Sequence, residues 1–387
     1  MKAAFPAINP ELSTGRRPGS AVCALRKVSW ISQALPTGLL DDKLKSPFAS
    51  VRYRLLIPAR ELQNRGIENV VISPEADARR NEELLAGSSA AVFGKLSIFD
   101  PRAFRESARQ HIALAARAQS LGIKVIADIC EDRFDHELLG GYWRDMVRMA
   151  DKVVTSTVYL AELVREAGAQ EVEIIPDPVE GQGGDPRFDA DLVTEAGADK
   201  PDGRARRLRI LWFGHQSNLD EVEEFLPALD RWAAARSIYV DFDIVTAAGF
   251  GVEKLVEERM VAGSGARVRY VEWSLEAADG ALRNCDFVII PATLHISRKK
   301  SKSANRLTES LHAGRFVLAH PVPSYLEFAK YAWISDDLLE GMEWALANPH
   351  SVVDRIKAGQ QLIRSNYLPG EIALRWANAV AQATAIT

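Results

Sequence analysis

The chain has 387 residues and a formal net charge of −4, with 47% hydrophobic and 26% charged residues. This length exceeds that of most single domains, so two domains are expected, and the composition is ordinary for a globular protein. The small negative charge gives no reason to expect a nucleic-acid-binding surface. No apolar run approaches the roughly 20 residues that span a bilayer, so no transmembrane segment is expected.

The cysteines and the N-terminal residues bear on the expected cellular location of the protein. Cys23, Cys130 and Cys285 lie far apart and lack metal-ligand spacing. We expect buried thiols at Cys130 and Cys285, no metal site, and a reducing, cytoplasmic location. Residues 1–20 contain several prolines and glycines but no apolar signal-peptide core, so they are predicted to form a flexible tail.

From residue 21 to about residue 180, short apolar runs alternate with helical patterns. Strands are predicted at Ala21–Leu25 or Val28–Ile31, and at Asn69–Ile72, Ala90–Phe93, Ile123–Ala127, Lys152–Thr155 and Val172–Ile175. Helices are predicted at Leu55–Arg65, Ala103–Leu121 and Val158–Ala167. Strands that alternate with helices are typical of parallel βαβ units, so this half is expected to form a doubly wound domain.

Residues 181–207 are rich in Gly, Asp, Pro and Arg and are predicted to be a linker. The alternation then resumes over residues 208–370, which predicts a second α/β domain. Its predicted strands are Leu208–Phe213, Val240–Val245, Val268–Val271, Phe287–Ile290 and Phe316–Ala319. Helices are predicted at Glu221–Arg236 and Val252–Val261, and a last helix lies within residues 371–387.

The most informative passage follows the strand Phe287–Ile290, where a basic loop, His295–Lys302, leads into a helical pattern. Lys302, Arg306 and Glu309 recur at four- and three-residue steps, which places them on one polar, exposed face. A cationic loop that leads into a helix N-terminus at the carboxyl end of a strand is suited to a diphosphate. The alternative is a solvated helix face with ordinary ion pairs.

A second candidate loop, Gly214–Asn218, follows the strand Leu208–Phe213. Glycine lets the backbone come close to a ligand, and Ser217 or Asn218 can cap the helix whose N–H groups would face an anion. His215 could reach a phosphate or a hydroxyl. A plain tight turn before a capped helix is the alternative.

These elements together resemble the donor half of a GT-B glycosyltransferase of the large retaining class, similar to glycosyltransferase family 4. The resemblance is carried by the strand that ends at Gly214, by Val271–Ser274 and Cys285–Pro291, and by Lys302-x-x-Asn305-Arg306-x-x-Glu309 with Gly314 and Val317. Ile174–Val179 is similar to the segment that closes the acceptor half. The resemblance implies two Rossmann-like, doubly wound domains that face each other across a cleft, with the final helix packed against the first domain.

The resemblance also implies a donor site. Lys302 and Arg306 would hold the diphosphate of the donor, and Lys302 would stabilise the leaving nucleotide. Glu309 would bind the ribose, Asn305 would be a further donor-binding residue, and the backbone near Trp273 would meet the nucleobase. Gly214, His215 and Ser217 would form the facing loop. The position eight residues before Glu309 is Ser301, where many relatives carry Glu, so contacts to the donor sugar do not transfer.

The first half would then bind the acceptor. Arg52 and Arg54, between a loop and a helix, could bind an anionic acceptor, or they could be solvent-exposed arginines at a helix start. Asp128, Asp132 and His136 follow a strand, and carboxylates at the end of a parallel strand face the crevice of an open α/β sheet. They would orient or deprotonate the acceptor hydroxyl. The alternative is an acidic loop neutralised by Arg133.

The function implied is transfer of a sugar, hexosyltransferase-type, from a nucleotide-activated donor to a hydroxyl of a glycan or lipid-linked acceptor. Retention of configuration, no cofactor and no metal are expected, with peripheral association at the cytoplasmic face of the inner membrane. A nucleotide-sugar epimerase or hydrolase, or a non-catalytic nucleotide- or sugar-binding protein, is the alternative.

Overall fold

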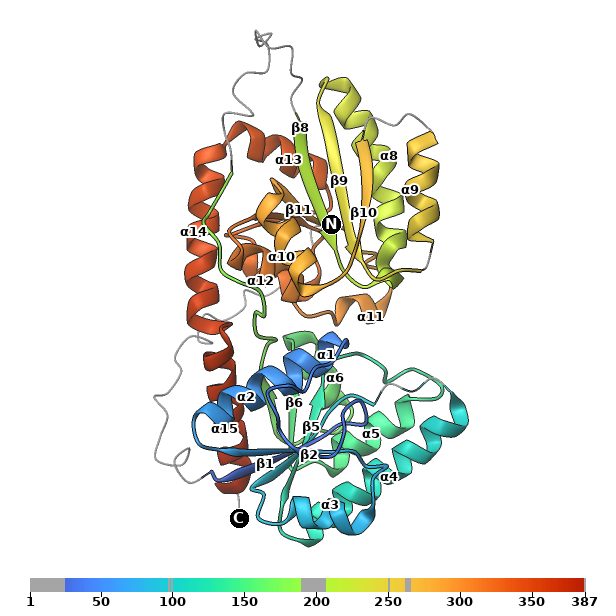
Figure 1. Cartoon of the computed structure of the whole chain (residues 1–387), viewed down its shortest axis with the longest axis vertical. Coiled ribbons are helices and arrows are strands. Elements are labelled where there is room, and N and C mark those ends of the chain that lie inside the picture. Colours follow the sequence, from blue (N-terminus) through green and yellow to red (C-terminus); the bar gives the residue numbers. More distant parts are fainter. Residues whose placement is uncertain are drawn as a thin grey trace. The chain divides into compact units, whose positions relative to one another are not determined.

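A computed structural model describes residues 25–96, 98, 100–188, 207–249, 251–261 and 266–385. It divides into two compact units (Figure 1). Unit 1 extends to Pro178 and includes the chain from Pro369 onward, whereas unit 2 is the continuous segment Val179–Leu368. The predicted tail, nearly all of Ala21–Leu25 and most of the predicted linker lie outside the described residues.

Unit 1 is built on a seven-stranded sheet with the order β2-β3-β1-β4-β5-β6-β7, in which only β2 is antiparallel to its neighbour. The strands are β1 Lys27–Ile31, β2 Gly38–Leu39, β3 Glu68–Ile72, β4 Ala90–Phe93, β5 Lys124–Ile129, β6 Lys152–Thr155 and β7 Val172–Ile174. Strands β4 and β6 are buried at every position, which explains the apolar sequence of β4 and the two central valines of β6, Val153 and Val154.

Helices cover both faces of this sheet (Figure 1). The unit contains a helical run of α1 Ala49–Val51, a π-helical turn Arg52–Leu56 and α2 Ile57–Asn64, then α3 Ala78–Leu85, α4 Pro101–Ser120, α5 Gly140–Met149, α6 Val158–Glu166 and α15 Pro369–Ala385. Residues of α2 and α15 share one core cluster with Trp30, and residues of α3 and α4 share another with Ile31. In the first cluster Trp376 of α15 meets Trp30 edge to face, with ring centroids 5.3 Å apart.

Unit 2 is built on a six-stranded parallel sheet with the order β10-β9-β8-β11-β12-β13. The strands are β8 Arg207–Phe213, β9 Tyr239–Thr246, β10 Ala266–Glu272, β11 Phe287–Ile290, β12 Phe316–Ala319 and β13 Trp333–Ile334. The helices are α8 Leu219–Ala235, α9 Val252–Val261, α10 Leu275–Asn284, α11 Ser297–Lys300, α12 Asn305–His312, α13 Leu338–Ala347 and α14 Pro349–Asn366.

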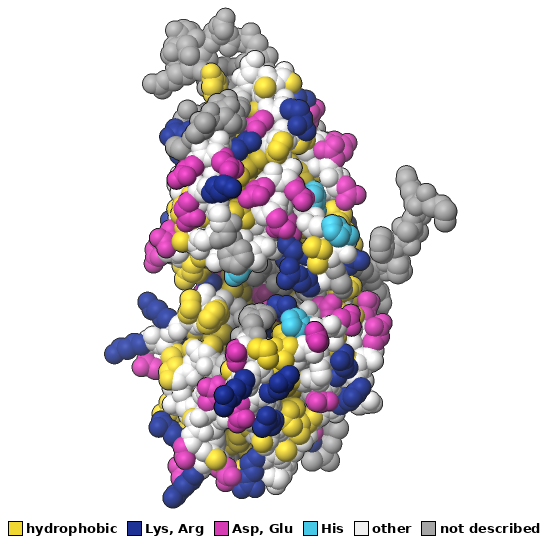
Figure 2. All heavy atoms as spheres, turned by 90° about the vertical axis from the view of Figure 1, so that its right-hand side faces the viewer, with side chains coloured by type: hydrophobic (Ala, Val, Ile, Leu, Met, Phe, Trp, Pro, Cys, Tyr) yellow, Lys and Arg dark blue, Asp and Glu magenta, His cyan; other side chains and the backbone are white. Residues whose placement is uncertain are grey.

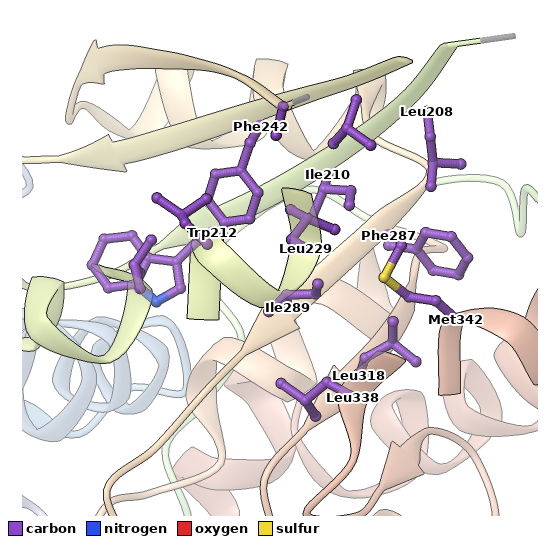
Figure 3. Packing of buried hydrophobic residues seen from close by; sticks show 14 of the residues in the cluster. Leu208, Ile210, Trp212, Leu229, Phe242, Phe287, Ile289, Leu318, Leu338 and Met342 are labelled. Carbon is purple, nitrogen blue, oxygen red and sulfur yellow. The ribbon is translucent and has the colours of Figure 1, made fainter. Parts of the chain in front are cut away.

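The core of unit 2 follows from the alternation of side chains along its strands. Ile210 and Trp212 of β8 point to one face, where they pack with Phe242 of β9 and Ile289 of β11 (Figure 3). Leu211, from the same strand, points to the other face and joins the cluster that holds Leu307 and Leu311 of α12, while Met342 belongs to the cluster of Trp212. Both faces of the sheet are therefore filled, which is the pattern of a doubly wound domain.

In both sheets the direction of winding reverses beside the first strand. In unit 1 the chain runs from β1 to β3 on one side and then crosses to β4 on the other, and in unit 2 it runs from β8 through β9 and β10 and crosses to β11. In open α/β sheets, ligands bind outside the carboxyl ends of the strands at such reversal points. The residues after β1 and β4, and those after β8 and β11, are therefore the places to look for sites.

Several expectations from the sequence need correction. Ser50–Arg54 was predicted to precede a helix but lies inside the helical run Ala49–Asn64, and the basic loop His295–Lys302 contains the short helix α11. Helices α3, α5, α10, α13 and α14 were not predicted. Within the described residues, no helix combines the length and apolarity needed to cross a membrane. On the face shown in Figure 2, basic and acidic side chains are interspersed.

Candidate functional site

The loop after β8 is shaped by close packing. A side chain at Gly214 would place its Cβ 3.2 Å from Nη1 of Arg306 and 3.3 Å from the ring of Trp212, so only glycine fits without displacing them. Next to it, Nδ1 of His215 accepts a hydrogen bond from the backbone N–H of Ser217 (3.2 Å) and lies 2.9 Å from its hydroxyl. His215 therefore caps the short 3₁₀ turn that leads into α8.

Two lysines from the region after β11 meet this part of α8. The ammonium groups of Lys299 and Lys302 both donate to Oδ1 of Asn218, each at 2.8 Å. Both also face Oε1 of Glu221, at 2.6 Å from Lys299 and 3.7 Å from Lys302. Side chains that share the same two acceptors lie close together, so two positive charges are held beside a single carboxylate.

A third cation faces this pair. Arg306, on the first turn of α12, has a buried Nη1 without a hydrogen-bond partner among the described residues, and Oε2 of Glu221 is likewise buried and unpartnered there. Burial, together with the charges of Arg306 and Lys299, lowers the pKa of Lys302 to about 7, although Glu221 acts in the opposite direction. The start of α12 thus lies in a partly buried site with more positive than negative charge.

Asn305 and Glu309 lie on α12 itself. Oδ1 of Asn305 accepts from the backbone N–H of Arg306 at 2.8 Å. The two carboxylate oxygens of Glu309 accept from the backbone N–H groups of Glu180 (2.6 Å) and Gly181 (3.0 Å). Glu309 is only 7% exposed, so the expectation that it lies on an exposed helix face is wrong. Its burial raises the pKa of the Glu309 carboxyl to about 7, against the effect of the two backbone N–H groups.

Two further positions of unit 2 were singled out from the sequence. Trp273 follows β10, its backbone N–H donates to the carbonyl of Thr246 at 2.9 Å, and its side chain packs partly buried beside the cluster of α10 and α12. Gly314 ends α12 with φ of 76°, and its N–H donates to the carbonyl of Leu311. Gly314 therefore follows the last turn of α12 in the left-handed conformation that favours glycine.

In unit 1, Arg54 and Asp128 bury each other. The guanidinium of Arg54 donates to both oxygens of Asp128, with a shortest distance of 2.7 Å, and also to Asp177 (3.2 Å) and the carbonyl of Ile175 (2.6 Å). Arg54 is 4% exposed and Asp128 2% exposed. The two aspartates raise the pKa of Arg54 despite its burial, and burial raises the pKa of Asp128 despite the pull of Arg54.

The other predicted residues of unit 1 are held by local contacts. Arg52 is also buried and donates to the carbonyls of Ser46 and Pro47. Oδ1 of Asp132 accepts from the N–H of Phe134 at 3.3 Å. Nδ1 of His136 accepts from two backbone N–H groups just before α5. Both Asp132 and His136 remain partly exposed.

The acidic segment after β5 has its own counter-ions. Arg133 pairs with Glu131 at 2.7 Å, and Lys95 after β4 also pairs with Glu131. A cavity of about 20 Å³, room for one water molecule, lies at the reversal point and is lined by Ser32, Lys95, Arg54, Asp128 and Cys130, among others. Cys285 is buried as expected, whereas Cys130 is only partly so.

The sequence did not single out Asn218 as a lysine partner, nor Lys299, Glu221 or Lys95. The charges of Lys299 and Glu221 are visible in the sequence, but their pairing joins positions 78 residues apart. Among the residues that the structure describes, no group of three or more His, Cys, Asp or Glu side chains is arranged to hold a metal ion.

No protein-family model matches the sequence, and no curated protein matches it. Solved structures do match over nearly the whole chain. The Anabaena protein HepE in complex with UDP is 11% identical, with a TM-score of 0.62 over 92% of this chain and 100% of that chain. HepE in complex with UDP-glucose gives a TM-score of 0.59 at 11% identity, over 92% of this chain and 99% of that chain.

A glycosyltransferase from Rickettsia africae is 10% identical, with a TM-score of 0.60 over 94% of this chain and 100% of that chain. At such low identity the similarity establishes the fold. The two Rossmann-like sheets and these matches together give the chain the GT-B fold, as the sequence predicted.

Proposed function

We propose that the protein is a glycosyltransferase that moves a sugar from a nucleotide-activated donor to an acceptor hydroxyl. The observation that carries the proposal is the surplus of positive charge at the start of α12. Lys299 and Lys302 contact the carboxylate of Glu221, and Lys302 also lies near the charges of Arg306 and Asp220, so three cations face two carboxylates beside the carboxyl ends of β8 and β11. A diphosphate carries the missing negative charge, and related folds hold UDP or UDP-glucose in HepE.

In this proposal the donor binds to unit 2. Lys302 and Arg306 hold the diphosphate, with Asn305 at the start of the same helix. Glu309 is proposed to accept hydrogen bonds from the ribose through the same carboxylate that accepts from the backbone N–H groups of Glu180 and Gly181. Trp273 lies on the nucleobase side.

The loop after β8 completes the donor site. Gly214 leaves room for the guanidinium of Arg306, since a Cβ at this position would lie 3.2 Å from its Nη1. His215 and Ser217 offer a ring nitrogen and a hydroxyl to the donor phosphates or sugar. Ser301 uses its hydroxyl to bond the carbonyl of Arg298, so it does not act as the carboxylate that many relatives carry there.

Chemically, the site would act on the leaving group. As the glycosidic bond to the donor phosphate breaks, negative charge develops on the diphosphate, and fixed cations nearby stabilise it more in the transition state than in the ground state. We propose Lys302 as the principal residue in this role. The reaction would proceed with retention and without a metal ion or another cofactor.

The acceptor is proposed to bind to unit 1. Arg54 and Asp128 are buried and neutralise each other, so we assign them a structural role at the carboxyl end of β5. Asp132 and His136 are then the residues proposed to contact the acceptor hydroxyl. Asp132 is the candidate base, and Arg52 is a candidate for an anionic acceptor group. A glycan or lipid-linked acceptor at the cytoplasmic face of the inner membrane, reached by peripheral association, is the proposed setting.

The experiment is a two-stage test on the full chain. Thermal unfolding with UDP, GDP, dTDP, ADP and CMP, and with their sugar derivatives, identifies the donor, because a ligand that binds the folded state raises its stability. The donor is then incubated with a panel of glycan and lipid-linked acceptors. A glycosylated acceptor supports the proposal, whereas epimerised or hydrolysed donor without acceptor, or binding without turnover, replaces it with another function.

A further inference from the structure

We infer that Glu221 is a positioning residue of the donor site, which holds the ammonium groups of Lys299 and Lys302 beside each other and keeps Lys302 charged for the incoming diphosphate. The inference rests on the proposed function of this site. Glu221 does not touch the donor in this account. It acts through Lys302, so donor binding should depend on pH in a way that Glu221 sets.

The contacts of Glu221 join three separate segments. It lies on the first turn of α8 and its side chain is only 1% exposed. Its Oε1 accepts from Lys299 at 2.6 Å and from the backbone N–H of Thr293, in the loop after β11, at 3.3 Å. Oε1 also lies 3.7 Å from the ammonium of Lys302. One carboxylate oxygen therefore fixes the loop after β11, α11 and the lysine before α12 relative to α8.

The charge around Lys302 makes this position sensitive to protons. Arg306 on α12 and Lys299 on α11 repel a proton on Lys302, and Glu221 and Asp220 on α8 attract one. The nearby Tyr325 is a buried neutral phenol whose pKa is raised by burial, and His215 after β8 bonds Ser217. Glu221 is the nearest negative charge to Lys302. Removing its charge should therefore lower the pKa of Lys302 more than removing any of the other groups would.

Donor binding should reverse this balance. Burial and the neighbouring cations lower the pKa of free Lys302 to about 7, so its ammonium group loses its proton as the pH rises through neutrality. A diphosphate next to Lys302 favours the charged form, because opposite charges at close range stabilise the ammonium. Binding should therefore take up a proton near neutral pH, and affinity should fall as the pH rises.

The competing explanation is that Glu221 is a buried ion-pair partner of Lys299 with no influence on the donor. Removing its charge would then lower stability, as expected when a buried pair is broken, but would leave the pH dependence of binding as in the wild type. Stability alone does not separate the two explanations. The pH profile does.

The test measures binding of UDP-glucose by titration calorimetry between about pH 6 and about pH 9. UDP-glucose is chosen because its diphosphate is doubly esterified and does not titrate in this range. If only protonated Lys302 binds well, the dissociation constant of the wild type should rise roughly 50-fold between about pH 7 and about pH 9. The same titration in two buffers with different heats of ionisation should show proton uptake near pH 7.

Three variants decide the role of Glu221. Glu221→Gln should shift the alkaline loss of affinity to lower pH, and Asn218→Asp, which adds a carboxylate where both lysines donate, should shift it to higher pH. The matched control Glu224→Gln changes an exposed glutamate of the same helix and should leave the profile unchanged. Asn218→Asp keeps the test open if Glu221→Gln does not fold.

The outcomes are separable. Opposite shifts in the two variants support the inference. A folded Glu221→Gln or Asn218→Asp protein with the wild-type pH profile overturns it while the proposed function stands. If the wild type binds none of the nucleotide sugars in the thermal-unfolding experiment, the proposed function is wrong and the inference is wrong with it. If it binds a nucleotide sugar other than UDP-glucose, the pH titrations use that donor instead.

Discussion

Replacing Arg54 by methionine should strongly destabilise unit 1. The variant keeps an unbranched but shorter side chain and removes the guanidinium that pairs with Asp128 at 2.7 Å and with Asp177 at 3.2 Å. It also leaves the carbonyl of Ile175 without its 2.6 Å donor. Breaking a buried pair by removing one partner costs about 3–5 kcal/mol, because the remaining charge stays buried.

The loss should depend on pH. The pKa of Asp128 is already raised by burial, and without the attraction of Arg54 it would rise further. Protonation neutralises the orphaned carboxylate, so the destabilisation should be largest at about pH 8 and smaller at about pH 5. A second change, Asp128→Asn in the Arg54→Met background, should recover part of the stability at about pH 8, since it removes the buried carboxylate that has lost the guanidinium.

Amide hydrogen exchange in urea gives the readout, because protection of β5 and β6 reports unit 1 separately from unit 2. Arg105→Met, at an exposed arginine of α4, is the matched control and should change stability by less than about 0.5 kcal/mol. Two results together would refute the structural role: Arg54→Met loses less than about 1 kcal/mol of stability, and it no longer uses anionic acceptors while still using neutral ones. Arg54 would then be a ligand of the acceptor.

The remaining predictions concern unit 2. Lys302→Ala should lower turnover roughly a hundredfold or more, which corresponds to a loss of about 2.7–4 kcal/mol of transition-state stabilisation. The control Lys330→Ala changes an exposed lysine and should leave turnover unchanged. If Lys302→Ala transferred sugar at the wild-type rate, Lys302 would not stabilise the leaving group. Glu309→Gln should cost about 1–3 kcal/mol of stability, because its amide N–H₂ would face a backbone N–H of Glu180 or Gly181. The pKa of Glu309 is about 7 in the folded state, so between about pH 4.5 and about pH 7 the folded protein binds more protons at Glu309 than the unfolded protein does. The contribution of Glu309 to stability therefore falls as the pH rises through this range. Melting temperatures of Glu309→Gln, measured across the same range, should lack this pH-dependent loss. Gly214→Ala should lower the stability of the protein by about 1–3 kcal/mol, because the added methyl group crowds Arg306 and Trp212. It should also weaken donor binding about tenfold by shifting Arg306. Unchanged donor affinity in calorimetry would contradict this packing.

The strands of the central sheets could be predicted because burial on both faces leaves continuous apolar runs. Phe287–Ile290 and Phe316–Ala319 were predicted with the bounds that the structure gives. The C-cap at Gly314 was predictable for a similar reason, since a positive φ after a helix favours glycine. Helix α5 was missed although its buried residues Trp143, Met146 and Val147 recur at three- and four-residue spacing, because the two glycines at its start, Gly140 and Gly141, are typical of a turn.

Charged residues were harder, because their burial depends on partners far away in the sequence. Arg54 looked like an exposed arginine at a helix start, but its partner Asp128 is 74 positions later. Glu309 has the spacing of a surface residue on α12, yet the chain at Glu180 and Gly181 covers it. Spacing within one helix predicts which residues share a face, and only the tertiary fold decides what lies over that face.

The order in which the polypeptide is made has a consequence for unit 1. Its sheet is encoded first, but α15 with Trp376, which shares one face with α2, is encoded after all of unit 2. During synthesis the apolar side chains around Trp30 and Ile126 therefore stay partly uncovered on that face while unit 2, a continuous segment, can already fold. A nascent chain arrested at Leu368 should show exchange protection in β8 and β11 before β1, and this interval is when a chaperone would have the most apolar surface to bind.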